Sequence, residues 1–216
     1  MNLILLGPPG SGKGTQAKFI EESYNLKQLS TGELFRNAVK EKTALGHHIQ
    51  QYMNNGHLVP DEITLDVVLD TIKRLKESAG FIFDGFPRTI VQAQSLYERG
   101  IEIQLVINFI IDLSRIEDRL ARRRICFSCK REYNIKYQPP KELNICDRCK
   151  GELIVRKDDA PNIIKKRIAD YQGLTHKLIA YYREKQILKD IDADLPIEEV
   201  RLEIKNILDP LVREKK

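Results

Sequence analysis

The nine residues Gly7-Pro8-Pro9-Gly10-Ser11-Gly12-Lys13-Gly14-Thr15 follow the apolar run Asn2-Leu3-Ile4-Leu5-Leu6 and open a stretch with a helical pattern. Glycines let the backbone curl and turn its N–H groups inward, Lys13 adds a positive charge, and the new helix adds its positive end. We therefore predict a strand, a phosphate-binding loop and a helix, with a nucleoside triphosphate as the ligand. Because Gly14 follows the lysine, the hydroxyl of Thr15 comes one residue later than in the usual pattern and need not hold magnesium directly.

Length and composition limit the class of protein. The chain has 216 residues, of which 42% are hydrophobic, enough for one substantial core and a small insertion. It has no run of about 18 uncharged apolar residues, and its N-terminus lacks a basic region before a cleavable apolar segment. We expect a cytoplasmic protein that neither spans a membrane nor is secreted.

The positive charge of the chain is concentrated in one segment. The formal net charge is +5, and residues 122–159 contain eleven Lys and Arg against six Asp and Glu, so the rest of the chain is balanced. Two interpretations remain open at this point: the segment binds an anionic ligand, or it presents a solvated face.

All four cysteines lie in the same segment, as Cys126-x-x-Cys129 and Cys146-x-x-Cys149. Two such pairs can place four thiolates around one metal, and Zn²⁺ suits four sulfurs with no open coordination position, so we predict a structural zinc site. Disulfides are the alternative, which a cytosolic context disfavours, and the spacing equally permits iron. Since the segment has too few large apolar residues for a core of its own, we expect a small metal-stapled β lobe inserted into a larger domain.

Strand and helix patterns alternate along the rest of the chain. The expected strands are Leu3 to Leu6, Lys27 to Leu29, Phe81 to Asp84, Leu105 to Ile110 and Asp190 to Ala193. A long helix is expected near Pro161, which suits a first helical position. Its buried stripe is predicted to be Ile164, Ile168, Tyr171, Leu174, Leu178 and Tyr181. Together these patterns predict an α/β fold, a doubly wound parallel sheet of five strands flanked by helices.

Two further segments carry candidate binding residues. The stretch between Ser30 and Val59 is predicted to be helical, with Ser30 and Thr31 serving either as a helix cap or as part of a second phosphate site that includes Arg36. The segment Phe81-Ile82-Phe83-Asp84-Gly85-Phe86-Pro87-Arg88 ends an apolar strand with a carboxylate. At that edge of the sheet, Asp84 can orient a hydrated Mg²⁺, and Arg88 can reach a phosphate across the same cleft.

These motifs together resemble adenylate kinase, in its bacterial-type form with a long metal-binding lid, over essentially the whole chain. The motifs that carry the resemblance are GPPGSGKGT at residues 7–15, LSTGELFR at 29–36, FDGFPRT at 83–89 with Gln92, the arginine-rich entry to the lid, the four cysteines and RKDD at 156–159. The resemblance implies reversible phosphoryl transfer from MgATP to AMP, giving two ADP. We expect no nucleic-acid or membrane partner, and we expect a monomer because nothing in the sequence resembles a dimerisation segment. The resemblance also implies a core of residues 1–29, 60–121 and 160–216, an AMP-binding insertion of residues 30–59 and a lid of residues 122–159 with structural Zn²⁺.

Site residues follow from the same resemblance. The implied ATP-binding residues are Gly10, Ser11, Gly12, Lys13, Gly14, Thr15, Arg119, Arg123, Glu132, Tyr133 and Leu195. The implied AMP-binding residues are Thr31, Arg36, His57, Leu58, Val59, Gly85, Phe86, Pro87, Arg88, Gln92, Arg156 and Arg167. The cations expected around the transferred group are Lys13, Arg88, Arg123, Arg156 and Arg167, because charge in this transition state is spread over phosphoryl oxygens. Their spacing of four predicts Arg119 and Arg123 on one face of a single helix.

Two alternative functions remain open from the sequence. One is a related nucleoside monophosphate kinase that accepts UMP, CMP or GMP, or uses GTP as donor. The other is a zinc-ribbon nucleic-acid-binding module attached to a nucleotide-dependent switch, suggested by the basic lid and its four cysteines. The second alternative leaves Arg36, Arg88 and Gln92 without a role.

Overall fold

Five short strands form one parallel sheet in the computed structural model. They are β1 (Leu3–Leu6), β2 (Lys27–Ser30), β3 (Phe81–Asp84), β4 (Leu105–Ile110) and β8 (Leu188–Asp192), in the order β2-β3-β1-β4-β8. The predicted parallel five-stranded sheet is therefore confirmed. The fifth strand begins two residues earlier than predicted, because Leu188 already pairs with Val106. Apolar and polar residues alternate in this edge strand, so its apolar signal in the sequence is weak.

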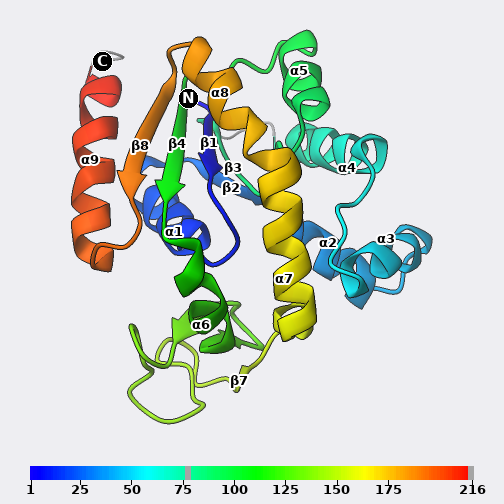
Figure 1. The fold of residues 1–216 in the computed structure, drawn as a ribbon, viewed down its shortest axis with the longest axis vertical. Coiled ribbons are helices and arrows are strands. Elements are labelled where there is room, and N and C mark those ends of the chain that lie inside the picture. The colour runs from blue at the N-terminus through cyan, green and yellow to red at the C-terminus, as the bar shows by residue number, and fades with distance from the viewer. Residues whose placement is uncertain (76–78, 214–216) are drawn as a thin grey trace.

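Helices cover both faces of the sheet (Figure 1). Helices α1 (Lys13–Tyr24) and α9 (Ile197–Arg213) pack on one face, where Leu3 and Leu5 are buried. Helices α4 (Asp61–Arg74), α5 (Ile90–Glu98) and α8 (Lys177–Glu184) pack on the other, where Ile4 and Leu6 are buried. Successive side chains of β1 thus pack into apolar cores on opposite faces of the sheet, because side chains alternate along a pleated strand and helices cover both faces.

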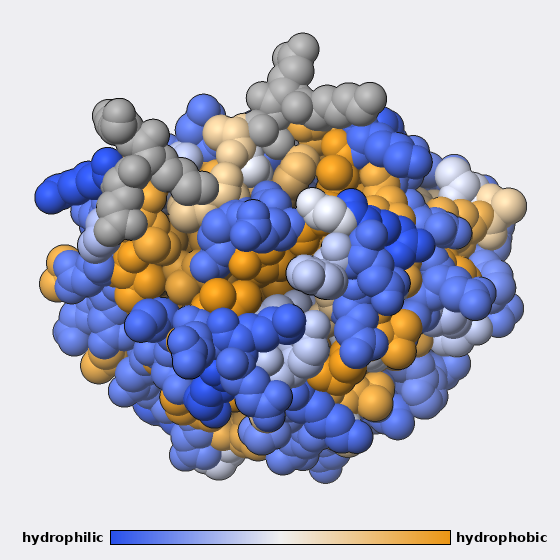
Figure 2. Space-filling model, turned by 90° about the horizontal axis from the view of Figure 1, so that it is seen from above, coloured by the Kyte–Doolittle hydropathy of each residue, from blue (hydrophilic) through white to orange (hydrophobic). Residues whose placement is uncertain are grey.

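The structure describes residues 1–75 and 79–213. The charged tail Arg213 to Lys216, which the sequence predicts to fray, lies outside the described residues from position 214 onward. Within residues 1–75 and 79–213, none of the helices is both long enough and apolar enough to cross a bilayer. Figure 2 views the molecule from above, and on this face orange apolar patches are broken up by hydrophilic residues.

The long helix near Pro161 is interrupted. Helix α7 (Pro161–Asp170) has Pro161 in its first turn, as predicted, and a π-helical turn, Tyr171–Thr175, separates it from α8. A π turn adds a residue to the helical repeat, so it shifts the face that later residues occupy. The prediction that Leu174 belongs to the buried stripe is therefore wrong: Leu174 is 43% exposed, whereas Thr175 is buried.

The segment after β2 forms a small helical lobe. Helices α2 (Thr31–Lys40) and α3 (Ala44–Asn54) pack together, and Phe35, Ile49 and Val59 form their shared apolar cluster. The helices approach closely because Gly46 lies against the backbone of α2. Ser30 lies at the start of α2 but makes no capping side-chain hydrogen bond.

The cysteine-bearing segment forms a second, antiparallel sheet. Its strands are β5 (Arg123–Cys126), β6 (Glu132–Asn134) and β7 (Leu153–Ile154), and they follow α6 (Ile116–Ala121), which the short 3₁₀ turn Leu113–Arg115 precedes. Cys126, Tyr133, Cys146 and Leu153 form its small buried cluster. A second 3₁₀ turn, Lys157–Asp159, leads back to α7. In Figure 1 this segment lies beyond the arrowheads of the parallel sheet, facing the end where β1 meets the phosphate-binding loop.

The close approach of α2 and α3 gives a stability prediction. A Cβ atom at Gly46 would lie 2.1 Å from the carbonyl oxygen of Ala38, so Gly46→Ala must push the helices apart. We expect a loss of about 1–3 kcal/mol in unfolding free energy, measured by urea denaturation. Gly173→Ala is the matched control, because a Cβ there meets no atom within 4 Å. Equal stability of the two variants would contradict this account of the lobe.

Candidate active site

The predicted phosphate-binding loop joins β1 to α1. Gly10 and Gly12 have φ angles of +79° and +96°, a region that residues with a side chain rarely adopt, which accounts for glycine at both positions. The Nζ atom of Lys13 donates to the carbonyl oxygens of Gly7 and Pro8, at 2.8 and 2.7 Å. Burial lowers the pKa of Lys13 to about 8. The ammonium group is thus poorly solvated, and an anion in the loop would stabilise its charge.

Asp84 stands beside the loop at the end of the neighbouring strand. It pairs in register with Leu5 of β1, so its carboxylate lies at the same edge of the sheet as Lys13. Gln28 donates to its Oδ2 atom at 3.0 Å. Burial raises the pKa of Asp84, and the charge of Lys13 partly opposes this. A carboxylate here has the oxygen chemistry that hydrated Mg²⁺ requires.

A continuous cleft runs from this loop to the helical lobe, and two hollows within it share Arg36, Arg88 and Arg167. The first hollow contains all of the predicted ATP-side residues, and the second contains most of the predicted AMP-side residues. Predicted residues that line the first are Gly10, Ser11, Gly12, Lys13, Gly14, Thr15, Asp84, Pro87, Arg119, Arg123, Glu132, Tyr133, Arg156 and Leu195. Those that line the second are Thr31, His57, Val59 and Gln92, while Leu58 and Gly85 line both. Phe86 lies in the core instead, 1% exposed.

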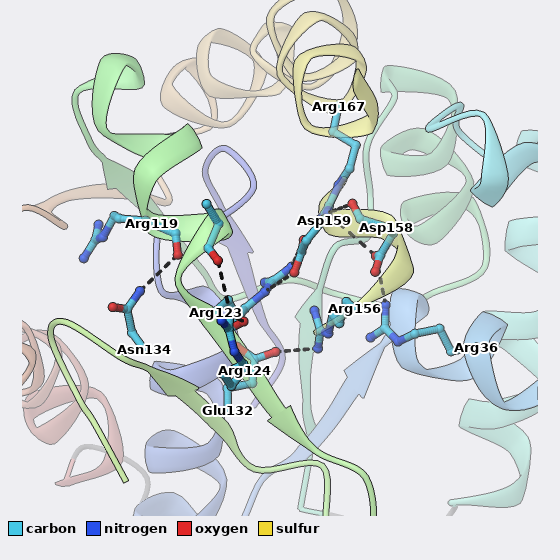
Figure 3. Close-up of polar contacts among 11 residues, drawn as sticks. Arg36, Arg119, Arg123, Arg124, Glu132, Asn134, Arg156, Asp158, Asp159 and Arg167 are labelled. Carbon is cyan, nitrogen blue, oxygen red and sulfur yellow. Dashed lines mark hydrogen bonds and ion pairs between the residues drawn. The ribbon is translucent and has the colours of Figure 1, made fainter. Parts of the chain in front are cut away.

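Asp159 holds two of the predicted cations together (Figure 3). Arg123 donates to both oxygens of this carboxylate, Nε to Oδ2 at 2.8 Å and Nη2 to Oδ1 at 2.5 Å, and Arg167 donates to Oδ1 at 3.1 Å. The Asp159 side chain is fully buried. The pKa of Arg167 is lowered to about 10, chiefly by burial; Asp158 and Asp159 oppose the fall, and the neighbouring Arg123 adds to it. Two guanidinium groups from different elements therefore face the same part of the cleft.

Two more arginines have carboxylate partners in the cleft. Arg156 donates to Glu132 at 2.5 Å, and Arg36 lies 3.6 Å from Asp158. Burial raises the pKa of Glu132, but the charges of Arg156 and Arg123 outweigh it, so the pKa is lowered and Glu132 is an anion. A phosphate entering the cleft would repel Glu132 and attract Arg156.

Arg119 and Arg123 lie on different elements, so the prediction of one shared helix face is wrong. Helix α6 ends at Ala121 and β5 begins at Arg123, because the chain enters the antiparallel sheet there. Arg119 instead donates to the carbonyl oxygen of Ala193 at 3.1 Å and lies 5.7 Å from the ring of Tyr137. Tyr137 and Leu195 both line the first hollow. Sequence reasoning missed Tyr137, since a tyrosine in a lid loop carries no motif.

Near the acceptor side, Thr31 keeps its predicted place, and Thr175 and Asp61 make contacts that no motif pointed to. Thr31 is buried and donates to the carbonyl oxygen of Gly85 at 2.8 Å, so its hydroxyl does not serve as a helix cap. Thr175 lines the cleft and donates to the carbonyl oxygen of Arg88 at 3.2 Å, a position that follows from the π turn. Asp61, at the start of α4, accepts a hydrogen bond from Gln92 at 2.7 Å.

The four cysteines form the predicted metal-binding cluster. Their Sγ atoms all lie within 4.8 Å of one another, and two pairs are 3.4 and 3.5 Å apart. Four sulfurs at about 2.3 Å from a tetrahedral zinc ion need separations of about 3.8 Å, so the cluster fits Zn²⁺. Tyr133 is buried beside it, with its hydroxyl 3.3 Å from Cys146 Sγ. The hydroxyl of Tyr133 is therefore engaged with the cysteine cluster.

Comparison with known proteins gives one consistent family. The adenylate kinase family model matches residues 5–187. An adenylate kinase of Archaeoglobus fulgidus is 45% identical over 215 residues, which cover 98% of this chain and 99% of that protein. Adenylate kinases of Clostridium botulinum (strain Loch Maree / Type A3) and Clostridium kluyveri are 44% and 41% identical over 212 residues, covering 96% of this chain and 98% of each relative.

The cysteine cluster gives a prediction that separates folding from chemistry. Replacing Cys126 and Cys129 by serine removes two of the four ligands. We therefore expect the double variant to lose bound zinc and to melt at a clearly lower temperature, whereas its turnover at a permissive temperature should be less affected. Metal analysis, calorimetry and a rate assay measure these quantities. Ser128→Ala, in the same turn, is the control. An unchanged melting temperature and unchanged zinc content in the double variant would contradict the structural role.

Proposed function

Because the chain belongs to the adenylate kinase family, we propose that it transfers the terminal phosphoryl group of MgATP reversibly to AMP, giving two ADP. One observation carries the proposal beyond family membership. The phosphate-binding loop and the acceptor-side hollow open into one cleft, and Arg36, Arg88 and Arg167 line both parts of it. Two nucleotides placed end to end would meet where these cations converge.

On the donor side, we assign the ATP phosphates to residues 10–15. The start of α1 and the charge of Lys13 support this assignment, since a helix N-terminus and a buried ammonium both favour phosphate. The ATP base would lie between Arg119 and Leu195, with Tyr137 beside it. We assign Glu132 no direct contact with the ATP phosphates, because two anions repel; Glu132 instead holds Arg156 through their ion pair. Tyr133 contributes to the structure of the lid.

On the acceptor side, we assign the AMP phosphate to Arg36 and Arg88 and the base to Thr31 and Gln92. The backbone from His57 to Val59 and the turn from Gly85 to Pro87 border the nucleotide, with Phe86 supporting that turn from the core. The Phe86–Pro87 peptide bond is cis. These residues come from three separate segments, which supports a shaped acceptor pocket.

The chemistry needs positioned charge and no covalent intermediate. Phosphoryl transfer passes through a loose transition state with charge on the equatorial oxygens, so fixed cations supply most of the stabilisation. We assign this role to Lys13, Arg88, Arg123, Arg156 and Arg167. When bound with ATP, Mg²⁺ neutralises phosphate charge, and Asp84 would hold it through water. Breaking the bond to the donor oxygen and forming the bond to an AMP phosphate oxygen transfers one phosphoryl group and releases two ADP.

Water competes with AMP for the phosphoryl group, so the cleft must exclude it. We propose that residues 30–59 and 122–159 are mobile lobes that close over a core of residues 1–29, 60–121 and 160–216. Contacts between lobes support this: Lys40 of α2 lies 5.5 Å from the ring of Phe127 in the lid, and Arg36 approaches Asp158. The lid metal, which we propose to be Zn²⁺, would serve rigidity.

We further propose a monomer in the cytoplasm that acts on free nucleotides. One chain supplies every residue assigned above, which supports a monomer, and four unpaired thiols suit a reducing compartment. Partners would be ATP, AMP and ADP. The basic lid residues Arg123 and Arg156 face carboxylates in the cleft, which favours the nucleotide assignment over a nucleic-acid surface.

An acceptor panel tests the function. MgATP is supplied with AMP, CMP, UMP or GMP in turn, and the nucleoside diphosphates are counted by chromatography. We expect AMP to give two ADP for each AMP consumed and to be used fastest. Release of inorganic phosphate without a diphosphate product would instead support a nucleotide-dependent switch. Preferred use of another acceptor would identify a related nucleoside monophosphate kinase.

The shared cation Arg88 gives a quantitative prediction. Its guanidinium faces both parts of the cleft, so Arg88→Ala should lower kcat/KM for AMP on the order of 10²-fold or more, as removal of one strong transition-state contact does. Steady-state kinetics with varied AMP measure this. Arg183→Ala is the matched control, because Arg183 pairs with Asp190 away from the cleft residues. A near-normal rate for Arg88→Ala would remove it from the catalytic set.

A further inference from the structure

The side-chain amide of Gln92 is fixed in one orientation by two neighbours. Its Nε2 atom donates to Asp61 Oδ1 at 2.7 Å, and its Oε1 atom accepts from the backbone N–H of Arg88 at 2.7 Å. A carboxylate only accepts hydrogen bonds and a backbone N–H only donates them. Turning the amide over would therefore set oxygen against carboxylate and N–H against N–H. Gln92 is 2% exposed, so water cannot relieve such a mismatch.

The fixed amide leaves one N–H and one oxygen lone pair for a ligand. Gln92 lines the acceptor-side hollow together with Thr31 and Arg88. Adenine presents a ring nitrogen acceptor beside an amino donor, which matches a donor and an acceptor placed side by side. Guanine presents the opposite pattern, a ring N–H beside a carbonyl oxygen, whereas cytosine has the adenine pattern. The orientation of the amide, and not only its presence, thus distinguishes the bases.

We propose that Asp61 is a positioning residue that sets the base selectivity of the acceptor pocket through Gln92. This inference rests on the proposed function. Asp61 begins α4, whereas Gln92 lies in the first turn of α5, so the contact joins two helices at the rim of the pocket. The Arg88 N–H alone would hold the amide by a single hydrogen bond, about which it can swing. The second hydrogen bond, from Gln92 Nε2 to Asp61, fixes the plane of the amide and determines which way its oxygen and nitrogen point.

Asp61 also has a structural contact that the experiment must separate. Thr89 donates to Asp61 Oδ2 at 2.9 Å, and its hydroxyl accepts from the backbone N–H of Gln92 at the start of α5. Loss of this contact would weaken the join between α4 and α5 without altering the amide–carboxylate bond. Thr89→Ala therefore isolates the structural contribution.

The test compares kcat/KM for AMP, GMP and CMP, with saturating MgATP, in the full-length wild type and its variants. In Asp61→Ala we expect the AMP-to-GMP ratio of kcat/KM to fall about tenfold or more, mainly through a higher KM for AMP, while CMP follows AMP. Asp61→Ser removes the same acceptor but suits a helix start, so it provides a second variant if alanine impairs folding. Asp61→Asn keeps an oxygen for Gln92 and should restore the ratio.

Thr89→Ala should lower the melting temperature and leave the AMP-to-GMP ratio unchanged. The inference is overturned if Asp61→Ala and Asp61→Ser reduce kcat/KM for AMP and GMP by the same factor, or if Thr89→Ala shifts the ratio as much as they do. These results differ from a failure of the proposed function, in which the wild type itself would not phosphorylate AMP.

Discussion

One buried carboxylate, Asp159, fixes the geometry on which the cleft depends. Its fully buried side chain accepts from Arg123 on β5 and from Arg167 on α7, so it joins the cysteine-bearing sheet to the parallel-sheet core. A buried charge is stable only when it is paired, and removing one partner of such a group costs about 3–5 kcal/mol. Asp159 thus holds two guanidinium groups close together although they repel each other.

The consequence is a cleft with more positive than negative charge. Seven Lys and Arg residues line the larger hollow, against Asp84, Glu132 and Asp170. Burial is the main cause of the lowered pKa of Lys13 and of Arg167. The oxygens of a nucleoside polyphosphate would give these buried cations additional negative partners. The cations are already in place before any ligand binds, which is the condition for electrostatic stabilisation of a transition state.

Local patterns predicted the framework, whereas the pairings inside the cleft needed the fold. The apolar runs of β1, β3 and β4 and the glycines around Lys13 are signals within a few residues, so the sheet and the loop could be predicted. The burial of Asp159 could not, because it depends on an arginine 36 residues earlier. The prediction that Arg119 and Arg123 share one helix was wrong because a spacing of four says nothing about where a helix ends. The prediction that Leu174 is buried was wrong because a π turn has no strong sequence signal.

Strand β6 shows how the metal cluster and the cleft can be distinct and yet connected. Side chains alternate across a strand: Tyr133 points to the cysteines, with its hydroxyl near Cys146, while Glu132 points to Arg156 in the cleft. A metal ion bound by the four cysteines would supply the stability that the few apolar residues of this sheet lack, on the strand face that Tyr133 occupies. The position of Glu132 is then set by a strand whose other face is fixed. Stability can therefore change without altering Arg36, Arg123, Arg156 and Arg167, since these cations are anchored by Glu132, Asp158 and Asp159 rather than by the thiolates.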